Sequence, residues 1–155
     1  AKSLAARMQN RRVVLAGDDP ATVIIASHGA QMLLRSGVLA ADAHMNDVLV
    51  GAGGLGGTGG GVSEDYDPIF HDDEIDGPRP QDPARVFVLT VGPDFAGVRR
   101  RTAALPDVAL VTAEDGADPV ASIAVPKPGG RLIDLAMLTI RLELTAAYSE
   151  LVGGR

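Results

Sequence analysis

The stretch RVVLAGDDPAT, residues 12–22, most constrains what this chain can fold into. It places four apolar residues, the length of a short strand, directly before Gly17, two aspartates and a proline. A carboxylate of Asp18 or Asp19 can accept the free backbone N–H groups of a helix's first turn. Pro20 suits the first helical position because its missing N–H is not needed there. The stretch therefore predicts a buried strand, a tight turn and a helix in succession.

The rest of the chain continues this alternation of strand and helix patterns. Strands are predicted at residues 13–16, 38–41, 86–90, 108–112 and 121–125, and helices at 1–10, 21–35, 43–50, 94–105 and 131–152. Only 3% of the residues are aromatic, so the core must be built from Val, Leu, Ile and Ala, as is typical of parallel strands buried between helices. We therefore predict a single α/β domain over residues 1–155, with a five-stranded parallel Rossmann-like sheet flanked by helices.

Residues 51–83 interrupt the pattern with a glycine-rich and then acidic segment. The run GAGGLGGTGGG costs too much conformational entropy to order as a helix or a strand. Seven of the 20 acidic residues lie between positions 64 and 76, where no Lys or Arg occurs, and the remaining 13 nearly balance the 14 basic residues of the chain. We predict one long surface insertion on a nearly neutral body.

The composition excludes several classes of function. A formal net charge of −6 disfavours nucleic acid as a partner, because phosphate neutralisation needs a basic face and the domain as a whole repels polyanions. There are no cysteines, which excludes disulfides, thiolate metal sites and thiol nucleophiles. No apolar run approaches the roughly 18 residues of a membrane-spanning helix, and no basic, apolar leader is present. The expectation is a soluble, cytoplasmic protein with no membrane partner.

Gly51, Gly53 and Gly56 match the spacing of the dinucleotide fingerprint G-x-G-x-x-G, behind the apolar triplet VLV. That motif works only where its last glycine opens a helix whose N-terminus faces the pyrophosphate. Here more glycines and the acidic segment follow, so a flexible loop is the favoured interpretation and no cofactor is predicted. A nucleotide- or flavin-binding Rossmann-like protein remains an alternative.

The acidic segment also contains a histidine, which makes a metal site worth testing against known motifs. Its potential ligands are Asp65, Asp67, His71, Asp72 and Glu74. Their spacing matches no calcium loop and no zinc signature. We predict no metal ion and interpret the segment as a solvated loop.

Two of the three histidines are candidates for acid–base chemistry in the predicted domain. His28 lies mid-helix beside Ser27, and adjacent helical residues do not face each other, so the two do not form a nucleophile and its base. His44 follows the second predicted strand, and open parallel sheets bind ligands beyond the carboxyl ends of their strands. His44 is therefore better placed than His28, with a structural or surface role as the alternative for each.

The turns after the first and third predicted strands lie at that same edge of the sheet. Their residues form the candidate ligand-binding set: Gly17, Asp18, Asp19, Thr22, Thr90, Gly92 and Asp94. Helix N-termini attract anions, but the three aspartates already supply negative charge here and would repel a phosphate. The carboxylates can instead accept hydrogen bonds from sugar or ribose hydroxyls, or cap their own helices.

Four segments carry a likeness to a known family. They are VVLAGD at 13–18, RVFVLTVG at 85–92, VALVTAEDG at 108–116 and SIAVPKPGGRLIDLAMLTIRLELTAAYSEL at 122–151. Their order resembles the sugar isomerase (SIS) domain, close to the phosphoheptose isomerase group. The resemblance implies an SIS-type sheet and two turns that hold a sugar phosphate, of which Gly17 matches the first and Thr90 and Gly92 match the second.

The same resemblance implies a glutamate and a histidine for proton transfer, the latter on the last helix. Asp134 stands near the acidic position of that helix, and Ala136 stands where the histidine is expected. We therefore expect a degenerate SIS-type domain that binds a small sugar-phosphate-like ligand or acts as a non-catalytic regulatory or scaffolding subunit. The alternative is an aldose–ketose isomerase of sugar phosphates with His44 or His28 as its base.

The predicted last helix, residues 131–152, is apolar on most of its sides. Its apolar residues are Leu132, Ile133, Leu135, Met137, Leu138, Ile140, Leu142, Leu144, Ala147 and Leu151. A helix so apolar all round is buried in its domain or shared with a second subunit. We expect a homo-oligomer formed through this helix.

Overall fold

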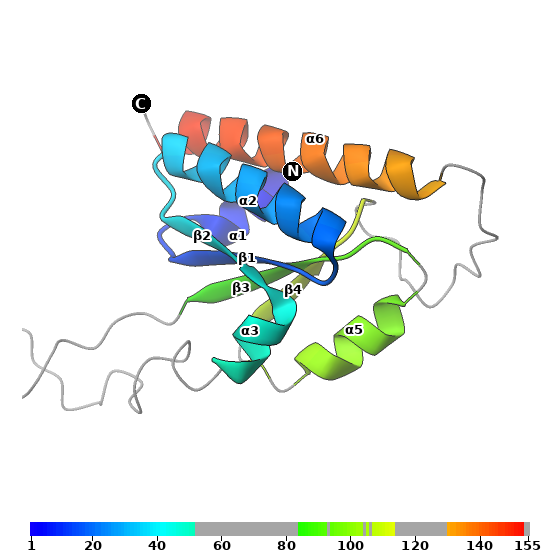
Figure 1. Cartoon of the computed structure of the whole chain (residues 1–155). Coiled ribbons are helices and arrows are strands. Elements are labelled where there is room, and N and C mark those ends of the chain that lie inside the picture. The colour runs from blue at the N-terminus through cyan, green and yellow to red at the C-terminus, as the bar shows by residue number, and fades with distance from the viewer. Residues whose placement is uncertain (52–83, 93, 104, 106, 114–129, 154–155) are drawn as a thin grey trace, which may run out of the picture.

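The computed structural model describes residues 1–51, 84–92, 94–103, 105, 107–113 and 130–153. In chain order the elements are α1 (Lys2–Met8), β1 (Val13–Gly17), α2 (Pro20–Arg35), β2 (Ala40–His44), α3 (Met45–Val50), β3 (Arg85–Leu89), α5 (Phe95–Thr102), β4 (Val108–Val111) and α6 (Gly130–Val152). Strands and helices alternate along the chain, so the α/β prediction is confirmed (Figure 1).

The described strands form one four-stranded parallel sheet in the order β2-β1-β3-β4. β1 is central, with Val13 in register with Ala40 of β2 on one side and with Arg85 of β3 on the other. The chain moves from β1 to β2 in one direction, and β3 and β4 are added in the other. This reversal creates a topological switch point at the carboxyl ends of β1 and β3, where Rossmann-like sheets bind their ligands.

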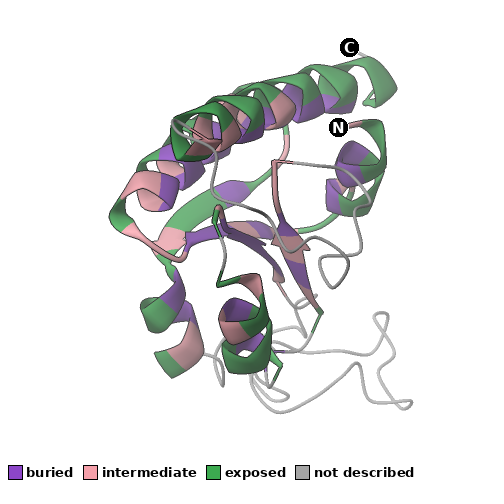
Figure 2. Cartoon of the chain, turned by 90° about the vertical axis from the view of Figure 1, so that its right-hand side faces the viewer, coloured by how far each residue is buried: buried purple, intermediate pink, exposed green. Residues whose placement is uncertain are grey.

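Helices cover both faces of the sheet. α1, α2 and α6 lie on one face, and α3 and α5 lie on the other (Figure 1). The first face buries a core that includes Leu15, Phe87, Leu33 and Leu142, and the second buries a smaller core around Val88 and other apolar residues of β1, β3, α3 and α5. Buried positions accordingly follow the inner sides of the helices and the strands between them (Figure 2).

β2 begins two residues later than the predicted strand at 38–41. Gly37 adopts a positive φ of 84°, and the backbone N–H of Val38 donates to the carbonyl of Leu33, so the apolar Val38 and Leu39 belong to the turn after α2. Val38 still packs against the core from this turn, which explains why its hydrophobicity resembled that of a strand. As a consequence, His44 is the last residue of β2, and the helix predicted from residue 43 begins at Met45.

The other predicted elements within the described residues are confirmed with small shifts of their ends. The fifth predicted strand, 121–125, lies outside the described residues, as do positions 52–83 of the predicted insertion. None of the described helices is long and apolar enough to cross a membrane.

Candidate functional site

The switch point brings together three of the predicted site residues. Asp18 directly follows β1, and its backbone N–H donates to the carbonyl of Leu89 at the end of β3, with N···O of 3.3 Å. Its carboxylate accepts a hydrogen bond from each of two threonine hydroxyls, Thr90 at 2.6 Å on Oδ2 and Thr22 at 2.9 Å on Oδ1. Both threonines are buried, and Asp18 is half-buried. Asp18 therefore joins the turns after β1 and β3.

The neighbouring Asp19 caps α2. Its Oδ1 accepts the backbone N–H groups of Ala21 and Thr22 at 2.8 and 3.0 Å, and the Thr22 hydroxyl accepts the backbone N–H of Asp19 at 3.0 Å. This reciprocal capping box satisfies the first donors of the helix. Of the two aspartates that could cap this helix, Asp19 does so, and Asp18 is left to face the switch point.

Arg131 completes this arrangement from the start of α6. Its guanidinium donates to Oδ2 of Asp19 at 2.8 Å, which links the first turns of α2 and α6 across 112 positions of sequence. The sequence-based site did not include Arg131. A signal was present, because a basic residue in the first turn of a helix opposes the macrodipole and is favoured there only beside an acidic partner.

Gly17 belongs to the predicted site for a packing reason. A Cβ at this position would lie 2.3 Å from the backbone nitrogen of Val23, so only glycine lets α2 approach the end of β1 this closely. The same close approach delivers Thr22 and the capping Asp19 to the carboxyl edge. Gly17 thus positions the site rather than contributing a polar group to it.

The turn after β3 is more open. Gly92 is exposed, adopts a positive φ of 108°, and would place an added Cβ in open space. Asp94 occupies the N-cap position of α5 without a side-chain cap hydrogen bond, and its carboxylate lies over Gly97 in the first turn of its own helix. Asp94 therefore folds back on α5 instead of joining Asp18.

Neither candidate histidine joins Asp18 and its threonines. His28 is on the outer side of α2, where Nε2 lies 3.0 Å from Oε1 of Glu143 on α6, and both side chains are exposed. His44 is exposed at the end of β2 and occupies the N-cap position of α3 without a side-chain cap hydrogen bond. His44 is level with Gly17 at the carboxyl edge, on the side of β1 away from Thr90.

The described residues contain no group of three or more His, Asp or Glu side chains that could hold a metal ion. The metal ligands considered in the acidic segment, and all of the G-x-G-x-x-G stretch beyond Gly51, lie outside the described residues. The predictions of no metal and no cofactor therefore stay predictions.

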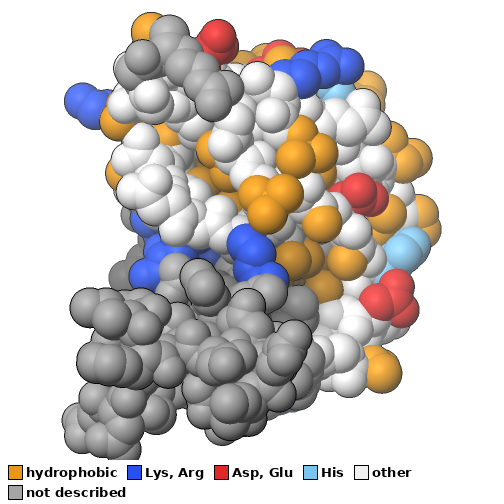
Figure 3. Space-filling view, turned by 90° about the vertical axis from the view of Figure 1, so that its left-hand side faces the viewer, with side chains coloured by type: hydrophobic (Ala, Val, Ile, Leu, Met, Phe, Trp, Pro, Cys, Tyr) orange, Lys and Arg blue, Asp and Glu red, His pale blue; other side chains and the backbone are white. Residues whose placement is uncertain are grey.

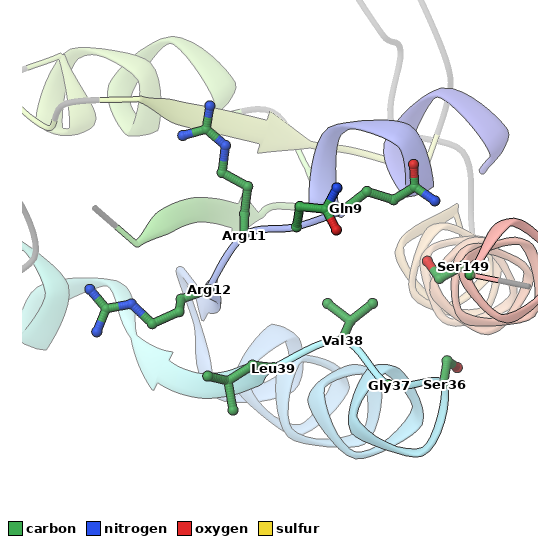
Figure 4. Close-up of a pocket in the computed structure, with 10 residues that line it drawn as sticks. Gln9, Arg11, Arg12, Ser36, Gly37, Val38, Leu39 and Ser149 are labelled. Atoms are coloured by element: carbon green, nitrogen blue, oxygen red, sulfur yellow. The ribbon is translucent and has the colours of Figure 1, made fainter. Parts of the chain in front are cut away.

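A recess of about 500 Å³ lies at the opposite edge of the sheet, between the loop before β1 and the C-terminal ends of α2 and α6 (Figure 4). The side chains of Arg11 and Arg12 point away from its centre (Figure 4). The hydroxyls of Ser36 and Ser149 donate to carbonyls of their own helices, both at 2.9 Å. On this side of the molecule, hydrophobic side chains alternate with polar surface (Figure 3). The recess is lined by Gln9 and Asn10 as well as the two arginines, and its lining contains no His, Asp or Glu that could serve as a base.

Comparisons with protein-family models, curated proteins and solved structures found no match to this chain.

Proposed function

We propose that this chain is a degenerate SIS-type domain that acts as a non-catalytic regulatory or scaffolding subunit. The observation that carries the proposal is the position of Asp19. Its carboxylate occupies the N-terminus of α2, where a bound phosphate would accept the same backbone N–H groups. Because the Asp19 carboxylate already accepts these N–H groups, they are not free to bind the phosphate of a sugar phosphate.

Two further charges support this reasoning. Arg131, the cation nearest to the cap among the described contacts, is already engaged by Asp19 at 2.8 Å. Asp18 places a second carboxylate beside the same turn, held by Thr22 and Thr90. A phosphate would have to displace Asp19, separate it from Arg131 and lie next to Asp18, and each of these steps is unfavourable.

Neither histidine of the isomerase alternative is positioned as a base by the described residues. Moving a proton between adjacent carbons of a sugar requires a base within hydrogen-bonding reach of the substrate. His28 pairs with Glu143 on the outer surface, and Ala136 occupies the position of the histidine implied by the family resemblance. His44 is the remaining candidate of the isomerase alternative, and the described structure gives it no orienting hydrogen bond.

A second candidate function is the binding of a small, uncharged hydroxylated ligand at the switch point. The observation that favours it is the Asp18 carboxylate, which already accepts hydrogen bonds from two hydroxyls, and Gly92, exposed with open space beside it, follows Thr90 by two residues. A sugar or ribose hydroxyl is chemically equivalent to the threonine hydroxyls bound there. Such a ligand would meet no like charge, in contrast to a phosphate ester.

Thermal-shift assays with matched pairs of sugars and sugar phosphates test both candidates. We expect no stabilisation by phosphate esters, and stabilisation by the unphosphorylated sugars only if the second candidate is right. Proton exchange at the sugar C2 in deuterated water, followed by NMR, tests catalysis directly. Exchange above the buffer rate that is lost in His44→Asn would overturn the proposal and support the isomerase. Saturable binding of a nucleotide or flavin would support the Rossmann-like alternative instead.

A further inference from the structure

α6 carries a second apolar stripe on the side that faces away from its own core. The core side is formed by Leu138, Leu142, Thr145, Ala146 and Ser149, which are buried. The opposite side exposes what we call the outer stripe, formed by Ile133, Met137, Ile140, Leu144, Ala147 and Leu151. The five large side chains of the outer stripe are 49 to 73% exposed.

The outer stripe has the spacing of a coiled-coil seam. Its members follow one another at intervals of four, three, four, three and four residues, which is the alternation of the a and d positions in a heptad repeat. A helix that packs only against its own domain needs one apolar side. Two apolar sides on one helix indicate two packing partners.

We propose that the outer stripe is the contact surface for α6 of a second copy of this chain, which gives a two-helix dimer interface. A seam with heptad spacing is matched by another helix of the same spacing, and in a symmetric dimer each copy supplies that helix to the other. Among the described helices, α6 is the one that presents such a seam to solvent. The second copy is therefore the partner that the chain itself provides.

The area of the outer stripe fits a modest dimer. Its exposed fractions correspond to about three whole apolar side chains, or on the order of 200–350 Å² per protomer. A standard interface buries about 800 Å² per partner, of which about 55–65% is apolar. The outer stripe supplies about half of this apolar area, and the half-exposed Tyr148 beside it adds to the remainder.

α6 is also held rigidly enough to present this surface. Its first turn is tied to α2 through Arg131 and Asp19, and its middle is fixed by Arg141, whose Nη1 donates to the carbonyl of Thr112 at 2.6 Å. A preorganised helix loses little conformational freedom when it binds. The inference does not depend on the proposed function, because it uses only the outer side of α6.

Analytical ultracentrifugation tests the dimer. We expect the wild-type chain to sediment as a dimer at about 50 µM, and the double variant Ile140→Glu, Leu144→Glu to weaken dimerisation by about 100-fold or more, because it buries unpaired charge. Val50→Glu is the matched control, since Val50 is 90% exposed on α3 at the other face of the sheet. Far-UV circular dichroism verifies that each variant is folded. A monomeric wild-type chain at this concentration, or equal dimerisation of the double variant, would overturn the proposal.

The absence of native cysteines allows a second, independent test. Ile140→Cys, Leu144→Cys is expected to form a disulfide-linked dimer on mild oxidation, whereas Val50→Cys is not. Ile140→Cys alone is expected to link the copies if the two helices run parallel, because a symmetric parallel pair places position 140 of each copy opposite itself. An antiparallel pair does so only where its twofold axis passes at that position. Failure of the double-cysteine variant to link, or equal linking of the Val50 control, contradicts contact along the outer stripe.

Discussion

At the carboxyl edge of the sheet, the carboxylates of Asp18 and Asp19 are bound by donors of the same chain, whereas along the outer stripe of α6 large apolar side chains are left in contact with water. Asp18 is held by two threonines, and Asp19 by its own helix and Arg131. The outer stripe has no comparable partner among the described residues. Because the donors at the carboxyl edge are already hydrogen-bonded within the chain, an anionic ligand would have to replace these bonds and would gain little binding free energy. Covering the outer stripe, in contrast, removes apolar surface from water and is favourable.

The two proposals together separate the place where a Rossmann-like sheet usually binds its ligand from the surface through which this chain is proposed to contact a partner. The switch point keeps the geometry of a Rossmann-like site, with two strand ends and a helix N-terminus converging. The carboxylates of Asp18 and Asp19 there are bound to groups of the same chain. Among the described residues, eight of the twelve exposed large hydrophobic side chains lie on α6 instead.

The largest effect is expected from truncating the inner side of α6 rather than its outer side. Leu142→Ala removes a fully buried side chain that packs against Gly29 of α2, and should lower the free energy of unfolding by about 2–5 kcal/mol. Leu144→Ala, on the outer stripe, should change it by less than about 0.5 kcal/mol in the monomer. Urea denaturation at low protein concentration measures both. Similar losses for the two variants would show that the outer stripe is part of the monomer's own core.

A smaller loss is expected from Gly17→Ala at the carboxyl edge. The added Cβ would lie 2.3 Å from the backbone nitrogen of Val23, which forces α2 away from β1 and should cost about 1–3 kcal/mol. Gly51→Ala, at an exposed helix end, is the matched control and should be nearly neutral. If the two variants unfold at the same urea concentration, the close approach of α2 to β1 does not contribute to the stability of the fold.

The smallest effect on stability, and the most informative one for function, is expected from Asp19→Gly. Glycine is tolerated at the N-cap, so the free energy of unfolding should fall by only a few tenths of a kcal/mol. The change frees the N–H groups of Ala21 and Thr22 and releases Arg131. We expect the variant to gain phosphate or sulfate binding with a Kd of roughly 1 mM, measured by calorimetry, because free N–H groups at a helix N-terminus bind anions. Adding Arg131→Ala should remove the gain, and tight phosphate binding by the wild-type chain would contradict the self-filled site.

The sequence predicted best where several local signals coincide. The start of α2 was predictable because a glycine, an N-capping aspartate and a proline stand in succession, and each has a separate stereochemical reason to be there. The position of β2 was predicted two residues too early. Its own residues, AADAH, show little alternation of apolar and polar side chains and lie at the sheet edge, while the apolar Val38 and Leu39 precede it in a turn. Local hydrophobicity cannot separate a strand from a turn that packs on the same core.

The position of the candidate site was predictable from the sequence, but the hydrogen-bond partners within it were not. Parallel strands necessarily bring the residues after β1 and β3 to one edge, so Asp18 and Thr90 were expected to lie near each other. Their hydrogen bond joins residues 72 positions apart, and the bond from Arg131 to Asp19 joins residues 112 apart. No local pattern encodes which carboxylate takes which partner. Whether the aspartates would face a ligand or their own fold therefore required the three-dimensional structure.

The position of α6 in the core has a consequence for how the chain is made. Leu138, Leu142 and Ala146 complete the apolar layer that α1, β1 and α2 begin, yet they are more than 100 residues further along the chain. At synthesis rates of about 5–20 residues per second, α6 is synthesised roughly 5–20 s after α2, and until then it cannot cover the inner side of α2. During that interval the nascent chain presents an uncovered apolar face to solvent or to a chaperone. The helix that is proposed to join two copies is thus also the helix that each copy needs in order to bury the apolar face of α2.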